Sequence, residues 1–209
     1  KGLKMLTKYF PETPMWASEG TRRGVESVEG DWRALTRGTA SEIGSLTFYP
    51  YRAHHDANEP LGFRIEGRDG TSIGWATDMG RWDEETVEHL EGVQYALIEA
   101  NHDPDMLRNG PYPAFLKRRV SGAKGHLSNH QARDLLAEIA SSSLERVMLG
   151  HLSDKNNAPD LATRTVRAAL DGADVAVDAA ARKTPGAMHA LSPPDHYESR
   201  VGEAQQALW

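Results

Sequence analysis

Two short apolar runs, at residues 95–100 and 145–150, constrain the fold of this 209-residue chain more than any other feature. Each run is compact and bounded by polar sequence, which is typical of a buried strand. Between them, residues 129–142 carry apolar side chains at the spacing of one helix face, after a capping-box pattern formed by Ser128 and Gln131. Together with the strands expected upstream, this order predicts an α/β layered domain.

The remaining elements are predicted from the same periodicities and from turn residues. Further strands are predicted over 13–16, 46–53, 61–66, 72–77, 174–179 and 187–191. Further helices are predicted over 1–9, 17–26 and 83–91, and after an Asn157 cap with Pro159 in the first turn. In the first helix, Leu3, Leu6 and Phe10 are expected to face inward. Residues 1–194 are expected to form one domain, followed by a polar tail over 195–209.

Composition limits the chemistry that any site in this chain can use. The chain has no cysteine, which excludes disulfides and thiolate ligands and fits a reducing, cytoplasmic compartment. A metal would therefore be bound by histidine and carboxylate groups, which suit Zn, Mn or Fe. The net charge of −6 argues against a general nucleic-acid binder but is compatible with a local basic groove. We expect neither a membrane span nor a signal peptide.

Three polar residues follow predicted strands, where α/β sheets place their sites. They are His55, Asp78 and His151. Imidazole binds borderline metals well, and a carboxylate can bridge two cations through its two oxygens. Taken singly, each residue has a structural alternative: a surface turn, a turn-forming aspartate or a hydrogen-bonded histidine at a strand end. Their occurrence together favours a metal site.

Two further polar segments are expected near this site. Residues 99–103 (EANHD) end a buried strand, and burying such groups is costly unless they are paired, so they are expected to line a site or to cap a turn. Residues 125–129 (GHLSN) precede a helix whose N-terminus would favour an anion such as phosphate. Arg118, Arg119 and Lys124 lie just before it, and either a phosphate patch or an ordinary charged surface accounts for them.

Together these segments resemble the YycJ-like (WalJ-like) branch of the metallo-β-lactamase-fold hydrolases. The resemblance lies in AHHDANEPLGF, ATDMG, LIEANHDPDMLRNGPYPAFLKRRV, GHLSN and LGHLSDKNN, within residues 47–161. It implies an αββα sandwich with a two-metal site. It also implies a 5′-to-3′ exonuclease that acts on single- or double-stranded DNA ends and is tied in related proteins to DNA repair.

The resemblance also assigns roles to individual residues. His55 matches the third-motif metal ligand, with its neighbour His54 as the alternative. Asp78 matches the bridging carboxylate, and His151 matches the last ligand of the second metal. The expected metal ligands are therefore His55, Asp78 and His151, held to Zn or Mn.

Further residues are expected to act on the substrate. His102 and His126 match polar residues near the family's cleft and are expected, with Asp78, to be catalytic. The expected substrate-binding residues are Asn129, Arg118, Arg119 and Lys124.

The family's main metal motif, His-x-His-x-Asp-His, lies just upstream of a helix that residues 1–6 resemble. The resemblance therefore implies that the printed chain starts after that motif and lacks the first strands of one sheet. We expect weak or partial metal binding, impaired nuclease activity, and a homodimer or other self-association that covers an exposed sheet edge. Two alternatives stay open: a non-catalytic domain that retains a nucleic-acid or protein-binding surface, and a hydrolase for another phosphoester or a lactone.

Overall fold

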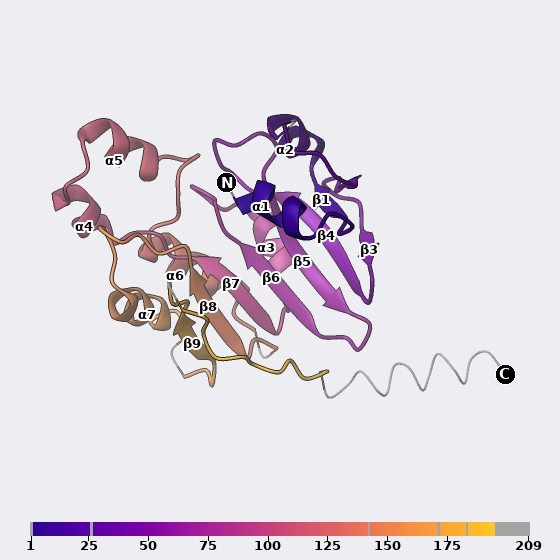
Figure 1. Cartoon of the computed structure of the whole chain (residues 1–209). Coiled ribbons are helices and arrows are strands. Elements are labelled where there is room, and N and C mark those ends of the chain that lie inside the picture. Colours follow the sequence, from indigo (N-terminus) through magenta and orange to yellow (C-terminus); the bar gives the residue numbers. More distant parts are fainter. Residues whose placement is uncertain (1, 26, 142, 171, 183, 195–209) are drawn as a thin grey trace.

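A central sheet of seven strands organises the chain in this computed structural model. The strands are β3 (Ser41–Ile43), β4 (Leu46–Arg52), β5 (Leu61–Gly67), β6 (Ser72–Ala76), β7 (Tyr95–Glu99), β8 (Arg146–Gly150) and β9 (Ala176–Ala179). They follow one another across the sheet in chain order, antiparallel from β3 to β6 and parallel from β6 to β9 (Figure 1). The structure describes residues 2–25, 27–141, 143–170, 172–182 and 184–194. The predicted tail over 195–209 lies outside them.

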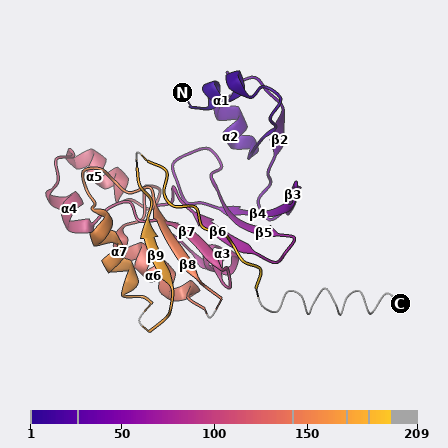
Figure 2. The same ribbon diagram turned by 60° about the horizontal axis from the view of Figure 1, so that its bottom comes forward.

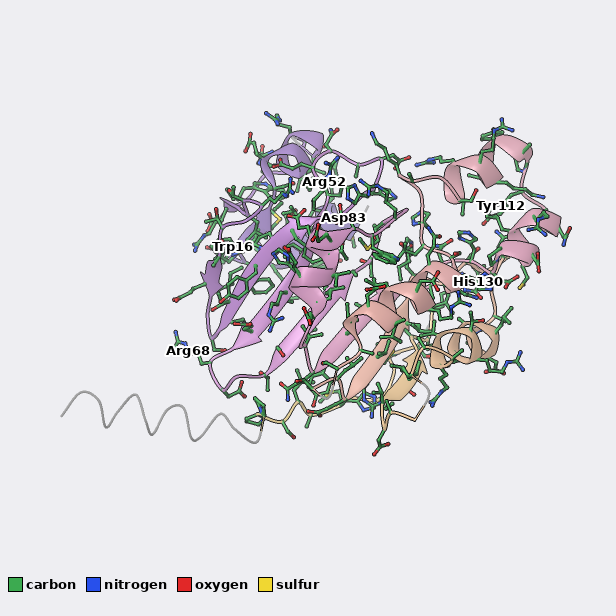
Figure 3. The ribbon with its side chains drawn as sticks, turned by 180° about the vertical axis from the view of Figure 1, so that it is seen from behind. Trp16, Arg52, Arg68, Asp83, Tyr112 and His130 are labelled. Carbon is green, nitrogen blue, oxygen red and sulfur yellow. The ribbon has the colours of Figure 1, made fainter. Side chains whose placement is uncertain are left out.

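Three helices cover one face of this sheet, which faces the viewer in Figure 3. They are α3 (Glu84–Leu90), α6 (Asn129–Ile139) and α7 (Pro159–Arg167). The predicted capping box between Ser128 and Gln131 is confirmed at the start of α6, and Asp83 with Thr86 forms another at the start of α3. The core between helices and sheet includes Tyr51, Ile98, Leu135, Leu149 and Val166. The predicted α/β class, with strands first and then strands alternating with helices, is confirmed.

The N-terminal residues form a small unit on the other side of the sheet (Figure 2). It contains α1 (Gly2–Tyr9), β1 (Met15–Ala17), α2 (Glu19–Gly24) and β2 (Trp32–Ala34). Strands β1 and β2 pair with each other in parallel and make a separate two-stranded sheet. The expectation that Leu6 and Phe10 face inward is wrong, because their side chains are 44% and 60% exposed. Helical spacing shows that apolar residues share one face of a helix, but it does not show whether another part of the chain packs against that face.

Two further local predictions need correction. Asn157 does not cap α7, because the N-cap is Ala158. The Asn157 amide is instead buried and donates to the Asn129 side chain and to the Ala100 carbonyl. The strand predicted over 187–191 is also absent, since those described residues have no regular secondary structure.

An arm between β7 and α6 was not predicted. It contains α4 (Pro104–Asn109) and α5 (Ala114–Val120), and it projects from the body near one end of the parallel strands (Figure 1). Both helices are short, and α5 buries no residue, so the arm lacks the apolar stripe that identifies a helix in sequence. Across the described part of the chain, no helix is both long and apolar enough to cross a membrane.

The close approach of β4 and β5 yields a stability prediction. Gly62 pairs with Tyr51, whose side chain is fully buried and donates a hydrogen bond to the Trp75 carbonyl. A methyl group at position 62 would lie 2.3 Å from Tyr51 Cζ, so the ring would have to move within a packed core. We expect Gly62→Ala to lower the free energy of unfolding by about 1–3 kcal/mol in urea titrations.

A matched control is Gly186→Ala, where an added methyl group meets no atom within 4 Å. It should change the free energy of unfolding by less than about 0.5 kcal/mol. Equal effects of the two substitutions would contradict the packing of Tyr51 against β5.

Candidate metal centre

Four strands deliver polar side chains to the same edge of the sheet. Strands β4, β6, β7 and β8 run in one direction, so their carboxyl ends meet there. His55 follows β4, Asp78 follows β6, Glu99 ends β7, and His151 follows β8. The order of strands in the sheet thus brings together residues that are almost 100 positions apart.

A cavity of about 290 Å³, here called the histidine cavity, opens at this edge. Its lining includes His55, His126, His151, Asp56 and Asp78, with Leu116, Arg119 and Val120 from α5 as one wall. Ligand atoms of His55, Asp78 and His126 lie within 4.8 Å of one another, as do those of Glu99, His126 and His151. The three residues predicted as metal ligands are therefore close together, and His126 lies between them.

Glu99 holds two of these histidines in place. Its carboxylate is fully buried and accepts hydrogen bonds of 2.8 Å from Nδ1 of both His126 and His151, and of 3.0 Å from the Met79 backbone N–H. Burial alone would raise the pKa of Glu99, but the hydrogen bonds from the two histidines outweigh it and the pKa lies below its usual value. A carboxylate that orients imidazoles in this way is a common partner of metal-binding histidines. The sequence marked Glu99 only as part of a polar segment.

Two residues of the site adopt an unusual backbone conformation. Asp78 and His151 have φ values of 56° and 57°, in the left-handed region that residues other than glycine seldom occupy. The Asn101 amide donates a 2.8 Å hydrogen bond to the His151 carbonyl and helps to hold that conformation. Each residue turns sharply off the end of its strand, which brings His151 Nδ1 to 3.4 Å from Asp78 Oδ1. Such outliers cluster at functional sites.

The two neighbouring histidines after β4 have different roles in the fold. His54 is buried, and its Nε2 lies 2.5 Å from the Asp83 carboxylate, which also caps α3. The His54 carbonyl accepts a hydrogen bond from the Gly80 N–H, so this residue joins the loops that follow β4 and β6. His55 faces the histidine cavity, and its buried Nδ1 lies 3.2 Å from Asp56 Oδ1 but makes no hydrogen bond with any described residue.

Two residues expected to act on the substrate, His102 and Asn129, are buried. His102 is buried, and that burial lowers its pKa to about 4, so its imidazole is neutral at physiological pH. Asn129 is fully buried, and its amide exchanges hydrogen bonds of 2.8–2.9 Å with Asn157. Neither side chain lines the histidine cavity. Their expected contact with substrate therefore has no support in the geometry.

The three basic residues predicted to bind phosphate lie in different places. Arg119 lines the cavity, where its Nε donates a 2.7 Å hydrogen bond to Asp56, and this contact holds the pKa of that carboxyl below its usual value. Lys124 is exposed and lines a neighbouring pocket. Arg118 is exposed on α5 and lines neither space.

Comparison with known proteins relates the sequence to one family. The family model described as "Beta-lactamase superfamily domain" matches residues 1–152. An exodeoxyribonuclease named YycJ from Bacillus anthracis is 28% identical over 176 residues, which cover 82% of this chain and 66% of that protein. An exodeoxyribonuclease named WalJ from Streptococcus pneumoniae is 33% identical over 140 residues, or 67% of this chain and 52% of that protein. The chain thus spans less than two thirds of the length of each of these relatives.

Solved structures show the same fold at low sequence identity. The metallo-β-lactamase fold protein YhfI from Bacillus subtilis superposes with a TM-score of 0.62 and 13% identity, over 85% of this chain and 65% of that one. Zn²⁺-bound PqqB from Methylobacterium extorquens gives a TM-score of 0.56 and 18% identity, over 85% and 64% of the two chains. These likenesses confirm the metallo-β-lactamase-like fold expected from the sequence.

The Glu99 contacts predict the titration of His151 in the metal-free protein. The hydrogen bond that His151 Nδ1 donates to Glu99 raises the pKa of His151. The contribution of this pair to folding stability is therefore complete below the usual histidine pKa of 6.5 and is lost as the pH rises through the raised pKa. Glu99→Gln keeps a hydrogen-bond acceptor but removes the charge, so the pKa of His151 should fall. The measurement is a histidine NMR titration between about pH 5 and 8 in the presence of a chelator.

His102 provides an internal reference, because a pKa of about 4 leaves it neutral across that pH range. It should show no titration in either protein. An unchanged pKa of His151 in Glu99→Gln would contradict the electrostatic role of Glu99.

Proposed function

This chain belongs to the family described as the beta-lactamase superfamily domain, and on that premise we propose that it is a metal-dependent phosphodiesterase, a 5′-to-3′ DNA exonuclease. The observation that carries the proposal is the histidine cavity, where His55, His126, His151 and Asp78 converge on one space at the strand ends. The curated relatives named exodeoxyribonucleases support DNA as the substrate class. The match covers 66% and 52% of the length of these two relatives.

The donor groups of the histidine cavity fit a divalent cation. His55 Nδ1 is buried and makes no hydrogen bond with the described residues, although Asp56 Oδ1 lies 3.2 Å away. Glu99 occupies Nδ1 of His126 and His151, which leaves Nε2 of each ring for another ligand. Asp78 adds a carboxylate. Nitrogen and oxygen donors without sulfur suit Zn²⁺ or Mn²⁺. Such a cation, when bound, would stabilise the negative charge that develops on a phosphodiester and lower the pKa of water.

The protein's own groups would bind and orient the substrate. Arg119 presents a guanidinium to the cavity, and its present partner Asp56 shows that it can pair with an anion at that point. Leu116 and Val120 make the same wall partly apolar, which limits the access of water. A strand end bound there would meet a cation from α5 on one side and the histidines on the other.

We also propose that this chain retains its metal weakly. Among the described residues, the donors that line the cavity and are not paired with arginine are His55, Asp78, His126 and His151, since Asp56 pairs with Arg119. Four donors complete the coordination of one tetrahedral cation, whereas a two-metal site needs more, even with a shared carboxylate. We therefore expect at most one metal ion per chain after extensive dialysis, rather than two, and slow turnover unless metal is added in excess.

Substitution of Asp78 tests the metal site directly. Asp78→Ala removes the only carboxylate in the His55–His126 group, so Mn²⁺ affinity should fall by at least about 10–100-fold, the loss seen when even a partner of a ligand is removed. Isothermal titration with Mn²⁺ measures the affinity. Asp134→Ala is the matched control, because Asp134 is an exposed carboxylate on α6 that pairs with its neighbour Arg133.

A cleavage assay in excess Mn²⁺ tests the reaction and its polarity. The substrate is a 5′-phosphorylated DNA strand with a fluorophore at its 3′ end. A 5′-to-3′ exonuclease shortens the labelled strand stepwise, whereas the opposite polarity releases the label at once. DNA cleavage that Asp78→Ala leaves intact, or Mn²⁺ binding with no cleavage of any DNA end, would overturn the proposal and favour a non-catalytic domain.

A further inference from the structure

We propose that a second pocket beside the histidine cavity binds the next phosphate of the same nucleic-acid strand. This inference rests on the proposed function and extends it to the path of the substrate. The pocket, here called the basic pocket, has a volume of about 320 Å³. Three basic side chains, Arg37, Arg52 and Lys124, contribute to its lining.

The basic pocket and the histidine cavity are neighbours that share one lining residue. His55 lines both. The chain also passes from one to the other at two points: Asp56 lines the cavity and Ala57 the pocket, while Gly125 lines the cavity and Lys124 the pocket. A strand with one phosphate at the histidines can therefore place its neighbouring phosphate in the basic pocket by crossing His55.

The charges in the basic pocket leave two cations available for an anion. Arg37 is already paired with Glu85 through two hydrogen bonds of 2.7 Å. The acidic residue of the pocket, Glu59, directs its carboxylate to the Gly20 N–H at 2.6 Å. Arg52 and Lys124 are exposed, and neither forms an ion pair or side-chain hydrogen bond with the described residues. The chain has a net charge of −6, so the pocket carries a charge opposite to that of the chain as a whole.

The backbone that carries each of the two cations is fixed by contacts with neighbouring segments. Arg52 ends β4, is paired with Leu61 of β5, and lies between the buried residues Tyr51 and Ala53. The loop that carries Lys124 packs directly on Gly80, where an added methyl group would lie 2.3 Å from the Gly122 carbonyl oxygen and 2.4 Å from the Gly125 nitrogen. The spacing between the two cations and the histidine cavity is thus set by the sheet and by a close backbone contact, which favours a defined phosphate position over a diffuse charged surface.

Binding of a single-stranded oligonucleotide tests the basic pocket without catalysis. The probe is a 3′-fluorescein-labelled, 5′-phosphorylated oligothymidine, and its fluorescence anisotropy is measured with metal chelated over a range of salt concentrations. Arg52→Ala and Lys124→Ala should each weaken binding by about two- to fivefold, the range of an exposed ion pair. Each should also reduce the slope of log affinity against log salt by about 0.7, the contribution of one phosphate of a single strand. Arg52→Glu should have a larger effect on affinity than Arg52→Ala.

Arg68→Ala and Arg68→Glu are the matched controls. They change the net charge equally, but Arg68 lies beyond the opposite end of the β4–β5 pair, as Figure 3 shows. They should leave both affinity and salt slope unchanged. If the Arg52 and Arg68 variants lost equal affinity for the oligonucleotide, the effect would come from net charge alone and the proposal would be overturned.

The outcomes also separate this inference from the proposed function. If the unmodified chain cleaves DNA but Arg52 and Lys124 variants bind the oligonucleotide normally, the basic pocket is refuted and the function stands. If the unmodified chain neither binds nor cleaves DNA, both fail. Thermal melting by circular dichroism verifies that each variant is folded, as expected for exposed side chains.

Discussion

The buried carboxylate of Glu99 is the interaction on which the histidine cavity depends. An unpaired charge at this depth would cost several kcal/mol, so the fold must surround it with donors. Those donors come from three segments: the loop after β6 through Met79, the approach to α6 through His126, and the turn after β8 through His151. A charge that is expensive to bury therefore links the parts of the chain that form the site, and it fixes the tautomer of both imidazoles.

Local sequence predicted most of the regular elements and the edge of the sheet where the site lies. Strand and helix periodicities are properties of neighbouring residues. His55, Asp78 and His151 were predicted from their joint occurrence after such strands and from the family resemblance of the segments that carry them. The role of Glu99 could not be read in this way, because its partners lie 27 and 52 residues away. The same limit explains the buried Asn129–Asn157 pair: each asparagine suited a local role, substrate contact or helix cap, but their mutual hydrogen bonds span 28 residues. Hydrogen bonds between polar side chains far apart in the sequence cannot be predicted from sequence periodicity.

Charge is distributed unevenly in a way that net charge conceals. The acidic total of the chain argues against broad affinity for nucleic acid, yet most acidic groups near the strand ends are already committed to histidines, arginines or helix caps. On the side of His55 that faces the basic pocket, Arg52 and Lys124 form no ion pair with the described residues. If the basic pocket binds the strand as proposed, its cations would guide the substrate to the histidine cavity and favour binding in one register.

The close contact at Gly80 has a consequence for how such a protein can diversify. The segment that follows α5 packs against the backbone of Gly80, two residues after Asp78. The outer part of the arm, with α4 and α5, is therefore attached to the body at a fixed point. Its length and surface can drift over evolutionary time without displacing the groups at the strand ends. A change in the arm could then alter which molecules enter the cavity without moving the reactive centre, and the close contacts at Gly80 and Gly125 are where the arm joins the part that must stay fixed.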